Sequence, residues 1–382
     1  MTSQLHQNLS TQNAQQKIRY AVVGLGWFAQ SAALPAFAHA ENSELVALVS
    51  DDPTKLAEIA QKYEGVQRTF SYEEYDDLLS SGLIDAVYIA LPNHLHCDYT
   101  VRAARAGVHI LCEKPMAVTV EECEAMIKAA ENYNVKLMIA YRLHLEEANL
   151  QAVELVQSQQ MGEPRIFNSL FTQQTVEGNI RLEKEKGGGT LDDIGIYCIN
   201  AARYLFQAEP IEVFATVGNN GEERFQEVAE MTTAILRFPD DRLASFTCSF
   251  GAAKVSTYQV IGTKGDLRVE PAYGSQGEIK HILTIEGEKQ EQTFEPHDQL
   301  AAEFVYFSDC VLQDKEPEPS GTEGLIDVQI IRALYQSIET GAFVQIDTPK
   351  RHQRPMPEQT IERPPTQEKS ALIHAADPSG KT

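Results

Sequence analysis

Residues 18–29 read IRYAVVGLGWFA, an apolar run that leads directly into a glycine-rich turn. The turn has the form GxGxxA, with Gly24, Gly26 and Ala29 at its fixed positions, and a helical pattern follows it. In a strand–turn–helix unit the first glycine permits the tight turn, the second lets the backbone approach a pyrophosphate, and the small third residue lets the helix lie close to the sheet. An ordinary glycine turn is the alternative, but the position between a strand and a helix favours a dinucleotide site. The expected phosphate-binding residues are Gly24, Leu25, Gly26, Trp27 and Phe28.

Around this turn, short apolar runs alternate with helical patterns from Lys17 to Tyr141. The runs are KIRYAVVG, ELVALVS, IDAVYIAL, VHILCEKP and VKLMIAY. Such alternation predicts right-handed βαβ units and a parallel sheet. The runs are apolar almost throughout, as is typical of strands covered on both faces. Residues 17–142 are therefore predicted to be a doubly wound Rossmann domain that binds NAD(P).

The pattern changes after Arg142, where a helix is expected over residues 145–159, followed by longer strands from Arg165 that one helix interrupts. Between residues 243 and 250, apolar side chains alternate with Ser245, Thr247 and Ser249. This period of two predicts a strand with one covered and one polar face. Residues 143–346 are predicted to form an α+β domain with a large, mainly antiparallel open sheet, which binds substrate and mediates oligomerisation. Helical patterns at 299–312 and 324–340 are expected to close this domain.

The two ends of the chain differ from the rest in composition. Residues 1–16 are polar and are predicted to be a flexible arm without the apolar stretch of a secretory signal, which favours the cytoplasm. Residues 347–382 are rich in proline and charge, with few apolar residues to bury. They are predicted to form an extended or disordered tail.

Composition excludes several classes of function. The formal charge of -23 over 382 residues argues against nucleic acid and anionic membrane surfaces as partners. No stretch approaches the roughly 20 apolar residues that a membrane helix needs. The six cysteines are dispersed without a CxxC pair, so the sequence predicts neither a disulfide framework nor a zinc site. His94, His96 and His144 do not show the spacing of metal ligands either, and no metal is expected.

The choice between NADP and NAD rests on the residues at the end of the second strand. A small residue with a nearby cation accommodates the 2′-phosphate of NADP, whereas an acid binds the ribose hydroxyl of NAD. Ser50 and Lys55 favour NADP, although Asp51 and Asp52 could repel a phosphate, and NAD remains the alternative. Asp52 precedes Pro53 and is interpreted as a helix N-cap rather than as a ligand.

The predicted strand VHILCEKP ends in Glu113-Lys114-Pro115, at the sheet edge where ligands of open α/β folds bind. Lys114 is expected beside the nicotinamide, although a solvated surface charge is the ordinary role of a lysine. The remaining residues expected to contact the cofactor are Leu91, Pro92, Asn93, His96, Glu113, Lys114 and Arg142.

Four motifs occur together in this order: GxGxxA, the EKP triplet, Tyr141-Arg142, and GGGTLDDIGIY over residues 187–197. Together they resemble the Gfo/Idh/MocA oxidoreductase family, and most of all its glucose–fructose oxidoreductase branch. The resemblance runs from about Ile18 to about Ile346. It implies that Lys114 contacts substrate and steers proton transfer, and that the peptide bond before Pro115 is cis.

The second family motif is commonly DxxxH, and this sequence carries Asp193 and Tyr197 in its place, as the glucose–fructose branch does. By resemblance, Tyr197 takes the acid/base role, and Arg142 and Arg181 are candidate substrate contacts or salt-bridge residues. Independently of the resemblance, residues four apart on a helix project from the same face, so Asp193 and Tyr197 can reach one site. An ammonium next to a phenol favours the phenolate, which would make Lys114 and Tyr197 an effective pair.

Ordinary structural roles are the alternatives for both residues. Tyr197 could be a buried aromatic with a satisfied hydroxyl, and Asp193 could be a favourable acid in the first turn of a helix.

These residues predict an NADP(H)-dependent oxidoreductase that oxidises the anomeric hydroxyl of an aldose to a lactone, with Lys114, Asp193 and Tyr197 as catalytic residues. Reduction of a second sugar could be coupled to it. One alternative is a dehydrogenase or reductase of another polyol or sugar derivative, and another is a non-catalytic NAD(P)-sensing protein. Because related enzymes pair their C-terminal sheets, a homodimer or homotetramer is expected.

Overall fold

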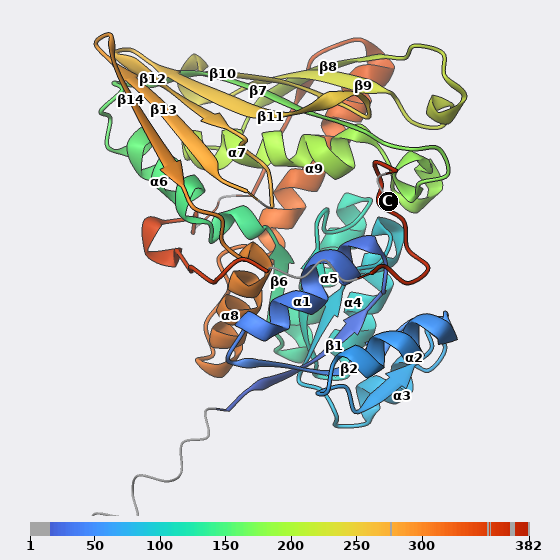
Figure 1. Cartoon of the computed structure of the whole chain (residues 1–382). Coiled ribbons are helices and arrows are strands. Elements are labelled where there is room, and N and C mark those ends of the chain that lie inside the picture. The colour runs from blue at the N-terminus through green and yellow to red at the C-terminus, as the bar shows by residue number, and fades with distance from the viewer. Residues whose placement is uncertain (1–15, 276, 350, 352, 367–370, 381–382) are drawn as a thin grey trace, which may run out of the picture.

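Six parallel strands form the first sheet, in the order β3-β2-β1-β4-β5-β6 (Figure 1). The strands are β1 (Ile18–Val23), β2 (Ser43–Val49), β3 (Arg68–Phe70), β4 (Ala86–Ile89), β5 (His109–Glu113) and β6 (Leu137–Ala140). The order reverses between β1 and β4, and open α/β sheets bind ligands at the carboxyl ends of strands at such a point. The computed structural model describes residues 16–275, 277–349, 351, 353–366 and 371–380, so residues 1–15 of the predicted N-terminal arm lie outside the described residues.

The predicted Rossmann sheet is confirmed, and each of the five apolar runs is a strand. Successive side chains of β1 alternate between two cores: Tyr20 and Val22 belong to one, Ala21 and Val23 to the other. The runs are therefore apolar throughout because both faces are covered. The sequence did not indicate β3, which has only three residues, two of them exposed.

Helices cover both faces of this sheet. They are α2 (Pro53–Lys62), α3 (Tyr75–Ser80), α4 (His96–Arg105), α5 (Val120–Tyr133) and a helical run after the glycine turn, made of a π turn (Ala29–Ala33), α1 (Leu34–Ala36) and a 3-10 turn (Phe37–His39). The start of α5 is fixed by a capping box, in which Thr119 accepts from the backbone of Glu122 and the Glu122 side chain accepts from the backbone of Thr119.

The second sheet has nine strands in the order β14-β13-β12-β11-β7-β10-β9-β8-β15. The strands are β7 (Pro164–Gln174), β8 (Glu212–Gly218), β9 (Met231–Arg237), β10 (Leu243–Ser249), β11 (Gly251–Gly262), β12 (Gly265–Glu270), β13 (Ile279–Ile285), β14 (Glu288–Phe294) and β15 (Val344–Gln345). All neighbours pair antiparallel except β7 and β10, which are parallel. The predicted mainly antiparallel sheet is confirmed. The alternation along β10 holds for Ala244, Phe246 and Cys248, which are buried, but Ser249 of the predicted polar face is buried as well.

Three helices belong to this second domain: α6 (Glu147–Gln157), α7 (Ile196–Phe206) and α9 (Gly321–Thr340). A π turn (Leu191–Gly195) leads into α7. Short 3-10 turns lie at Asn93–Leu95, Arg142–His144, Ile180–Leu182, Lys184–Lys186, Glu223–Phe225, Pro239–Asp241 and Pro357–Gln359. In Figure 1, α7 and α9 lie between the nine-stranded sheet and the first domain, so only the opposite sheet face is left open.

Helix α8 (Gln299–Leu312) was expected to close the second domain, and that prediction is wrong. Its apolar side packs on the first sheet, in one core with Tyr20, Leu45 and Tyr88. The hydroxyl of Ser308 lies 2.8 Å from the hydroxyls of both Tyr20 and Ser43. A helical pattern shows which face of a helix is apolar, but not which sheet that face covers.

The described part of the C-terminal tail is extended and packs on both domains. Arg351 lies 2.6 Å from Glu318, Arg363 pairs with Glu41, and Ile373 is 7% exposed. The composition of the tail predicts few apolar residues to bury. Its contacts are made by single residues separated by polar stretches, and such residues show no helix or strand periodicity in the sequence. Within the described residues no helix is both long and apolar enough to span a bilayer.

Candidate functional site

The glycine turn after β1 has the geometry of a phosphate cradle. Gly24 has φ of +96°, and a Cβ at this position would lie 2.6 Å from the carbonyl oxygen of Ala90, so no other residue fits. A Cβ on Gly26 would meet nothing within 4 Å. Leu25 is buried, Trp27 and Phe28 are half-buried, and Gly26 is exposed. The turn therefore leaves open space in front of the helical N-terminus, where a pyrophosphate can approach backbone N–H groups.

The acids at the end of β2 are engaged with the protein. Asp52 is the N-cap of α2 and accepts a hydrogen bond from the backbone N–H of Lys55 at 3.0 Å, as predicted. Its other carboxylate oxygen lies 2.8 Å from Nδ1 of His374. Asp51 accepts from the backbone N–H of Tyr72 at 2.8 Å. The hydrogen bond from Lys55, followed by that from His374, lowers the pKa of Asp52.

Lys114 joins the first domain to the second. It follows β5, and its peptide bond to Pro115 is cis, which confirms the expectation. Its ammonium donates to the backbone oxygen of Asp193 at 2.9 Å and lies 3.7 Å from the Asp193 carboxylate. The same ammonium is 4.7 Å from the centre of the Tyr197 ring. Residues from both predicted domains thus meet at the carboxyl edge of the first sheet.

Asp193 is held between two cations. Arg181 donates to its carboxylate at 2.9 Å, on the side opposite to its contact with Lys114. Burial would raise the pKa of Asp193, but Arg181 and Lys114 together lower that pKa below its ordinary value. Asp193 is therefore ionised and fixed in position. A carboxylate can accept further hydrogen bonds, so it remains able to bind a hydroxyl group.

Tyr197 stands on α7 among aromatic side chains. Its ring centre lies 5.5 Å from that of Phe171 and 5.9 Å from that of Tyr273. The side chain is half-buried, and within the described chain its hydroxyl has no hydrogen-bond partner. A packed ring with a free hydroxyl differs from the ordinary buried tyrosine, whose hydroxyl is satisfied.

The segment before Tyr197 differs from the expected α-helix. Residues Leu191–Gly195 form a π turn, which commonly occurs at functional sites. Asp192 and Asp193 have different partners. Asp192 pairs with Arg332 at 2.6 Å and accepts from the Tyr335 hydroxyl at 2.5 Å, behind the site.

Arg142 lines the pocket, and most of its hydrogen-bond donors are used by protein atoms. Its guanidinium is 6% exposed and donates to the carbonyl oxygens of Tyr273, at 2.6 Å, and Gly274, at 3.2 Å, and to the side chain of Gln299. It lies 5.1 Å from the centre of the Tyr197 ring. These bonds hold the loop after β12 against Tyr197, so Arg142 shapes the site from behind and has few donors left for a ligand.

The other residues expected to contact the cofactor divide into two groups. Leu91 and Pro92 follow β4, at the same sheet edge as the glycine turn. The remainder are engaged with protein atoms. His96 is fully buried, with its two ring nitrogens 2.9 Å from the carbonyl oxygens of Pro115 and Leu91, so it joins two loops of the site rather than facing a ligand. Asn93 donates to the carbonyl oxygen of Gly187 at 2.7 Å.

Glu113 accepts from the Tyr88 hydroxyl at 2.5 Å. Desolvation raises the pKa of Glu113, in spite of the neighbouring Lys114.

Several residues that line the pocket were missed from the sequence. The pocket around Lys114 and Tyr197 is also bordered by Tyr141, Asn200 and Tyr204. Asn200 could have been found, since it lies three residues after Tyr197 on the same helix. Phe171 comes from β7 and Tyr273 from the loop after β12, and no local pattern connects them to Tyr197.

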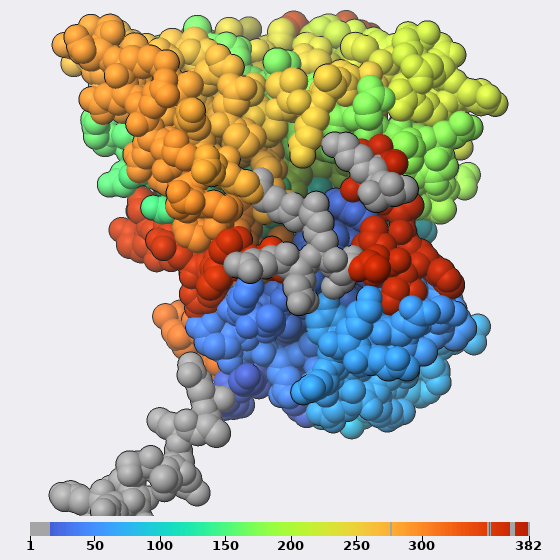
Figure 2. All heavy atoms as spheres, viewed as in Figure 1, coloured from blue at the N-terminus to red at the C-terminus, as the bar shows by residue number. Residues whose placement is uncertain are grey.

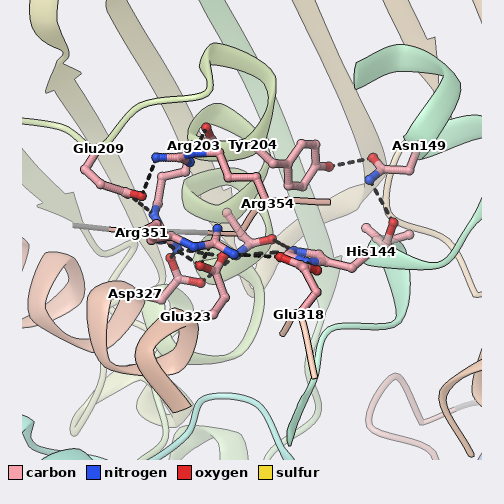
Figure 3. A network of polar contacts seen from close by, with 12 residues as sticks. His144, Asn149, Arg203, Tyr204, Glu209, Glu318, Glu323, Asp327, Arg351 and Arg354 are labelled. Carbon is pink, nitrogen blue, oxygen red and sulfur yellow. Dashed lines mark hydrogen bonds and ion pairs between the residues drawn. The ribbon is translucent and has the colours of Figure 1, made fainter. Parts of the chain in front are cut away.

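A network of buried charges lies beneath this pocket (Figure 3). Arg203 is fully buried and pairs with Glu323 at 2.9 Å, Asp327 at 2.5 Å, and Glu209. The network reaches the pocket through Asn200, which donates to Glu323 at 2.7 Å and to Asp327 at 2.9 Å.

Three further side chains extend the network. His144 lies 2.7 Å from the Asn200 side-chain oxygen and 2.8 Å from Glu318. Arg351 of the tail pairs with Glu318 and Glu323, both at 2.6 Å. Burial would raise the pKa of Glu318, but His144 and Arg351 lower it to about 2.

Comparisons with known proteins agree with this geometry. Residues 18–141 match the model of an oxidoreductase family with an NAD-binding Rossmann fold, and residues 149–268 match the GFO/IDH/MocA C-terminal domain. The chain belongs to the GFO/IDH/MocA family. The resemblance seen in the sequence is therefore confirmed.

Individual relatives are similar over most of their length. The chain is 38% identical to the D-xylose 1-dehydrogenase [NADP(+)] of Haloarcula marismortui over 337 residues, which are 86% of this chain and 93% of that protein. It is 30% identical to D-xylose 1-dehydrogenase (NADP(+)) 2 of Haloferax volcanii over 86% of this chain and 99% of the relative. The crystal structure of aldose-aldose oxidoreductase from Caulobacter crescentus, complexed with glycerol, has a TM-score of 0.83 at 36% identity and covers 87% of this chain and 100% of that chain.

Proposed function

We propose that this member of the family oxidises the C1 hydroxyl of an aldose of the glucose or xylose type to a lactone, with NADP⁺ as the oxidant. The observation that carries the proposal is the approach of the Lys114 ammonium to within 4.7 Å of the Tyr197 ring, at the sheet edge that bears the glycine turn. Relatives named as xylose dehydrogenases support the substrate class.

Each residue of the site has a distinct chemical role. Tyr197, as its phenolate, accepts the proton of the C1 hydroxyl, and its oxygen is free to do so because it has no partner among the described residues. Lys114 stabilises the phenolate electrostatically and donates a hydrogen bond to the reacting oxygen. Asp193, fixed by Arg181, accepts a hydrogen bond from a neighbouring sugar hydroxyl. When bound, NADP⁺ would supply the hydride acceptor for C1 at this sheet edge.

Three observations favour NADP as the cofactor. Ser50, a small residue, follows β2, and Lys55 lies in the first turn of α2. Asp51 and Asp52, which could repel a 2′-phosphate, are occupied by the Tyr72 backbone and by His374. Two relatives carry NADP(+) in their names.

A second candidate function is the coupled oxidation of one aldose and reduction of another. The similarity to an aldose-aldose oxidoreductase favours it. Oxidation of the first sugar to a lactone releases a hydride and a proton, and reduction of the carbonyl group of a second sugar to an alcohol consumes both. The same residues would serve both half-reactions.

The proposal is tested by the near-ultraviolet absorbance of reduced nicotinamide. We expect the band to appear when xylose or glucose is added to the protein with NADP⁺, and less strongly with NAD⁺. If the band declines on addition of a second aldose, the coupled function applies. Activity only on polyols or other sugar derivatives would replace the aldose assignment, and cofactor binding without reduction by any sugar would leave a nucleotide-sensing protein.

We also infer that two copies of the chain associate through the open face of the nine-stranded sheet. This face carries apolar side chains from three adjacent strands: Ile166 is 41% exposed, Leu170 45%, Leu243 44% and Ile235 37%. In the order of the sheet, β7, β10 and β9 lie side by side, so these residues form one patch. An isologous dimer pairs such a patch with itself.

Replacing Leu170 by Asp should shift the assembly toward smaller species, because each copy of the pair would bury an unpaired carboxylate. Sedimentation velocity at several protein concentrations measures this shift. Val217→Asp is a matched control, since Val217 is 41% exposed but shares the inward-facing side of β8 with the buried Val213 and Ala215. An unchanged mass for Leu170→Asp would contradict the inferred interface.

We propose a cytoplasmic location, which the state of the thiols supports. All six cysteines are free, and five of them are buried. Unpaired cysteines are typical of a reducing compartment.

A further inference from the structure

Residues 371–380, here called the strap, are attached to the glycine turn. The backbone N–H of Ile373 donates to the side chain of Gln30 at 2.8 Å, and Gln30 donates back to the Ile373 carbonyl oxygen at 2.9 Å. Gln30 also donates to the carbonyl oxygen of Leu25 at 2.8 Å, within the turn itself. Ile373 is 7% exposed and belongs to the core that contains Leu25 and Ala29. The strap is thus packed directly beside the phosphate cradle.

A second set of contacts attaches the strap to the adenosine side of the site. His374 lies 2.8 Å from the carboxylate of Asp52, the residue that caps α2 after β2. Lys62, in the last turn of α2, donates to the carbonyl oxygen of Ala371 at 3.2 Å. In Rossmann domains the end of the second strand faces the ribose that bears the 2′-phosphate of NADP.

The strap also reaches the second domain. The backbone N–H of Val176, just after β7, donates to the carbonyl oxygen of Pro378 at 2.9 Å. A Cβ built on Gly380 would lie 3.9 Å from the Cβ of Val176. Figures 1 and 2 show the red C-terminal residues between the blue first domain and the green second domain. The strap therefore bridges the two domains on the side of the glycine turn.

The strap borders the phosphate cradle and does not fill it. Among the described residues, none of the strap hydrogen bonds to the backbone N–H groups of Gly26, Trp27 or Phe28. The space in front of Gly26 is likewise free within 4 Å of a built Cβ. A dinucleotide can thus lie along the turn while the strap is in place.

We propose that the strap closes the adenosine side of the cofactor site and retains NADP(H) between turnovers, with His374 engaging the Asp52 carboxylate near the 2′-phosphate. This proposal rests on the proposed use of NADP(H). Release of the dinucleotide would require the strap to detach from Gln30 and Asp52. The strap is therefore expected to act on the dissociation rate more than on the association rate.

The first test measures the release of bound NADPH from the full chain without sugar, by nicotinamide fluorescence after mixing with excess NADP⁺. Ile373→Asp should accelerate release by roughly tenfold or more, because it removes the apolar anchor beside the glycine turn. His374→Ala should accelerate release of NADPH more than that of NADH, since its partner Asp52 would then face the 2′-phosphate. Ile361→Asp is the matched control, because Ile361 is a half-buried isoleucine of the same tail that bonds to Leu145 rather than to the strap contacts.

The second test locks the strap in place. The distance of 3.9 Å between the Cβ positions of residues 176 and 380 lies within the range of about 3.5–4.5 Å that is usual for a disulfide. A cysteine at position 380 must adopt the φ of +71° that Gly380 has, so the oxidised and reduced forms of the same variant are compared to separate the cross-link from that backbone strain. The variant Val176→Cys with Gly380→Cys, loaded with NADPH and oxidised, should release it at least roughly tenfold more slowly than after reduction with a thiol. The unmodified chain, oxidised in the same way, controls for its six native cysteines.

Equal rates of NADPH release from Ile373→Asp, the unmodified chain and the cross-linked variant would contradict the proposed role of the strap. The proposed function would then still stand. Altered release without oxidation of any sugar would support the strap and contradict the aldose assignment. Failure to bind NADP(H) at all would overturn both.

Discussion

Replacing Tyr197 by Phe should lower kcat for aldose oxidation by about 10²- to 10⁴-fold, the usual contribution of a positioned acid/base group. The substitution removes only the hydroxyl. The ring would keep its contacts with Phe171 and Tyr273 and its position 4.7 Å from Lys114. The pocket should therefore keep its shape, and the Kd for NADPH, measured by fluorescence titration, should stay within about twofold of the original value.

Tyr204→Phe provides the matched control for this prediction. Tyr204 lines the same pocket, but it donates its hydroxyl to Asn149 at 2.6 Å and so has a structural role. Its removal should reduce stability by roughly 1 kcal/mol with little effect on kcat. If Tyr197→Phe turned over aldose as fast as Tyr204→Phe does, the proposed acid/base role of Tyr197 would be refuted.

Replacing Arg203 by Met should lower the free energy of unfolding by about 3–5 kcal/mol. Arg203 is fully buried, and Glu323 and Asp327 are buried with it. Without the guanidinium these two carboxylates would remain in the interior without their main counterion. Chemical denaturation followed by circular dichroism measures the loss.

The control for Arg203 is an ion pair of the same kind at the surface. Arg237 pairs with Glu212 at 3.0 Å, and its side chain is 44% exposed. Arg237→Met should lower the free energy of unfolding by at most about 1 kcal/mol, because solvent already screens that pair. If both variants lowered the free energy of unfolding by similar amounts, burial would not explain the effect at Arg203.

Because Asn200 connects the network to the pocket, Arg203→Met should also raise KM for the sugar in the fraction that remains folded.

Much of the fold could be predicted from local patterns. The five apolar runs of the first sheet, the alternation along β10 and the glycine turn each follow from the periodicity of a strand or the conformational freedom of glycine. The N-cap at Asp52 was likewise predictable, since it is formed within one short segment, from Asp52 to Lys55. Strand β3 could not be predicted, because it is too short to show a period. The placement of α8 could not be predicted either, because it depends on which core is nearest.

The site could be predicted only in part. Lys114, Asp193 and Tyr197 were identified from motifs, and the structure brings them together with Arg181. The same reasoning assigned ligand contacts to Arg142 and His96, whose hydrogen bonds are directed to protein carbonyl groups. A motif identifies the residue type at a position, whereas the partners of a side chain depend on segments far away in the chain.

By itself, the sequence determined the Rossmann domain, the open second sheet and the residue types available for sugar oxidation, since these depend on neighbours along the chain. Only the tertiary structure decided that Lys114 contacts Asp193, 79 residues away, that Arg142 holds a loop, and that the tail returns to the glycine turn. The physical reason is that such contacts depend on the packing of whole sheets and helices. No period or motif within either segment encodes how that packing brings the two segments together.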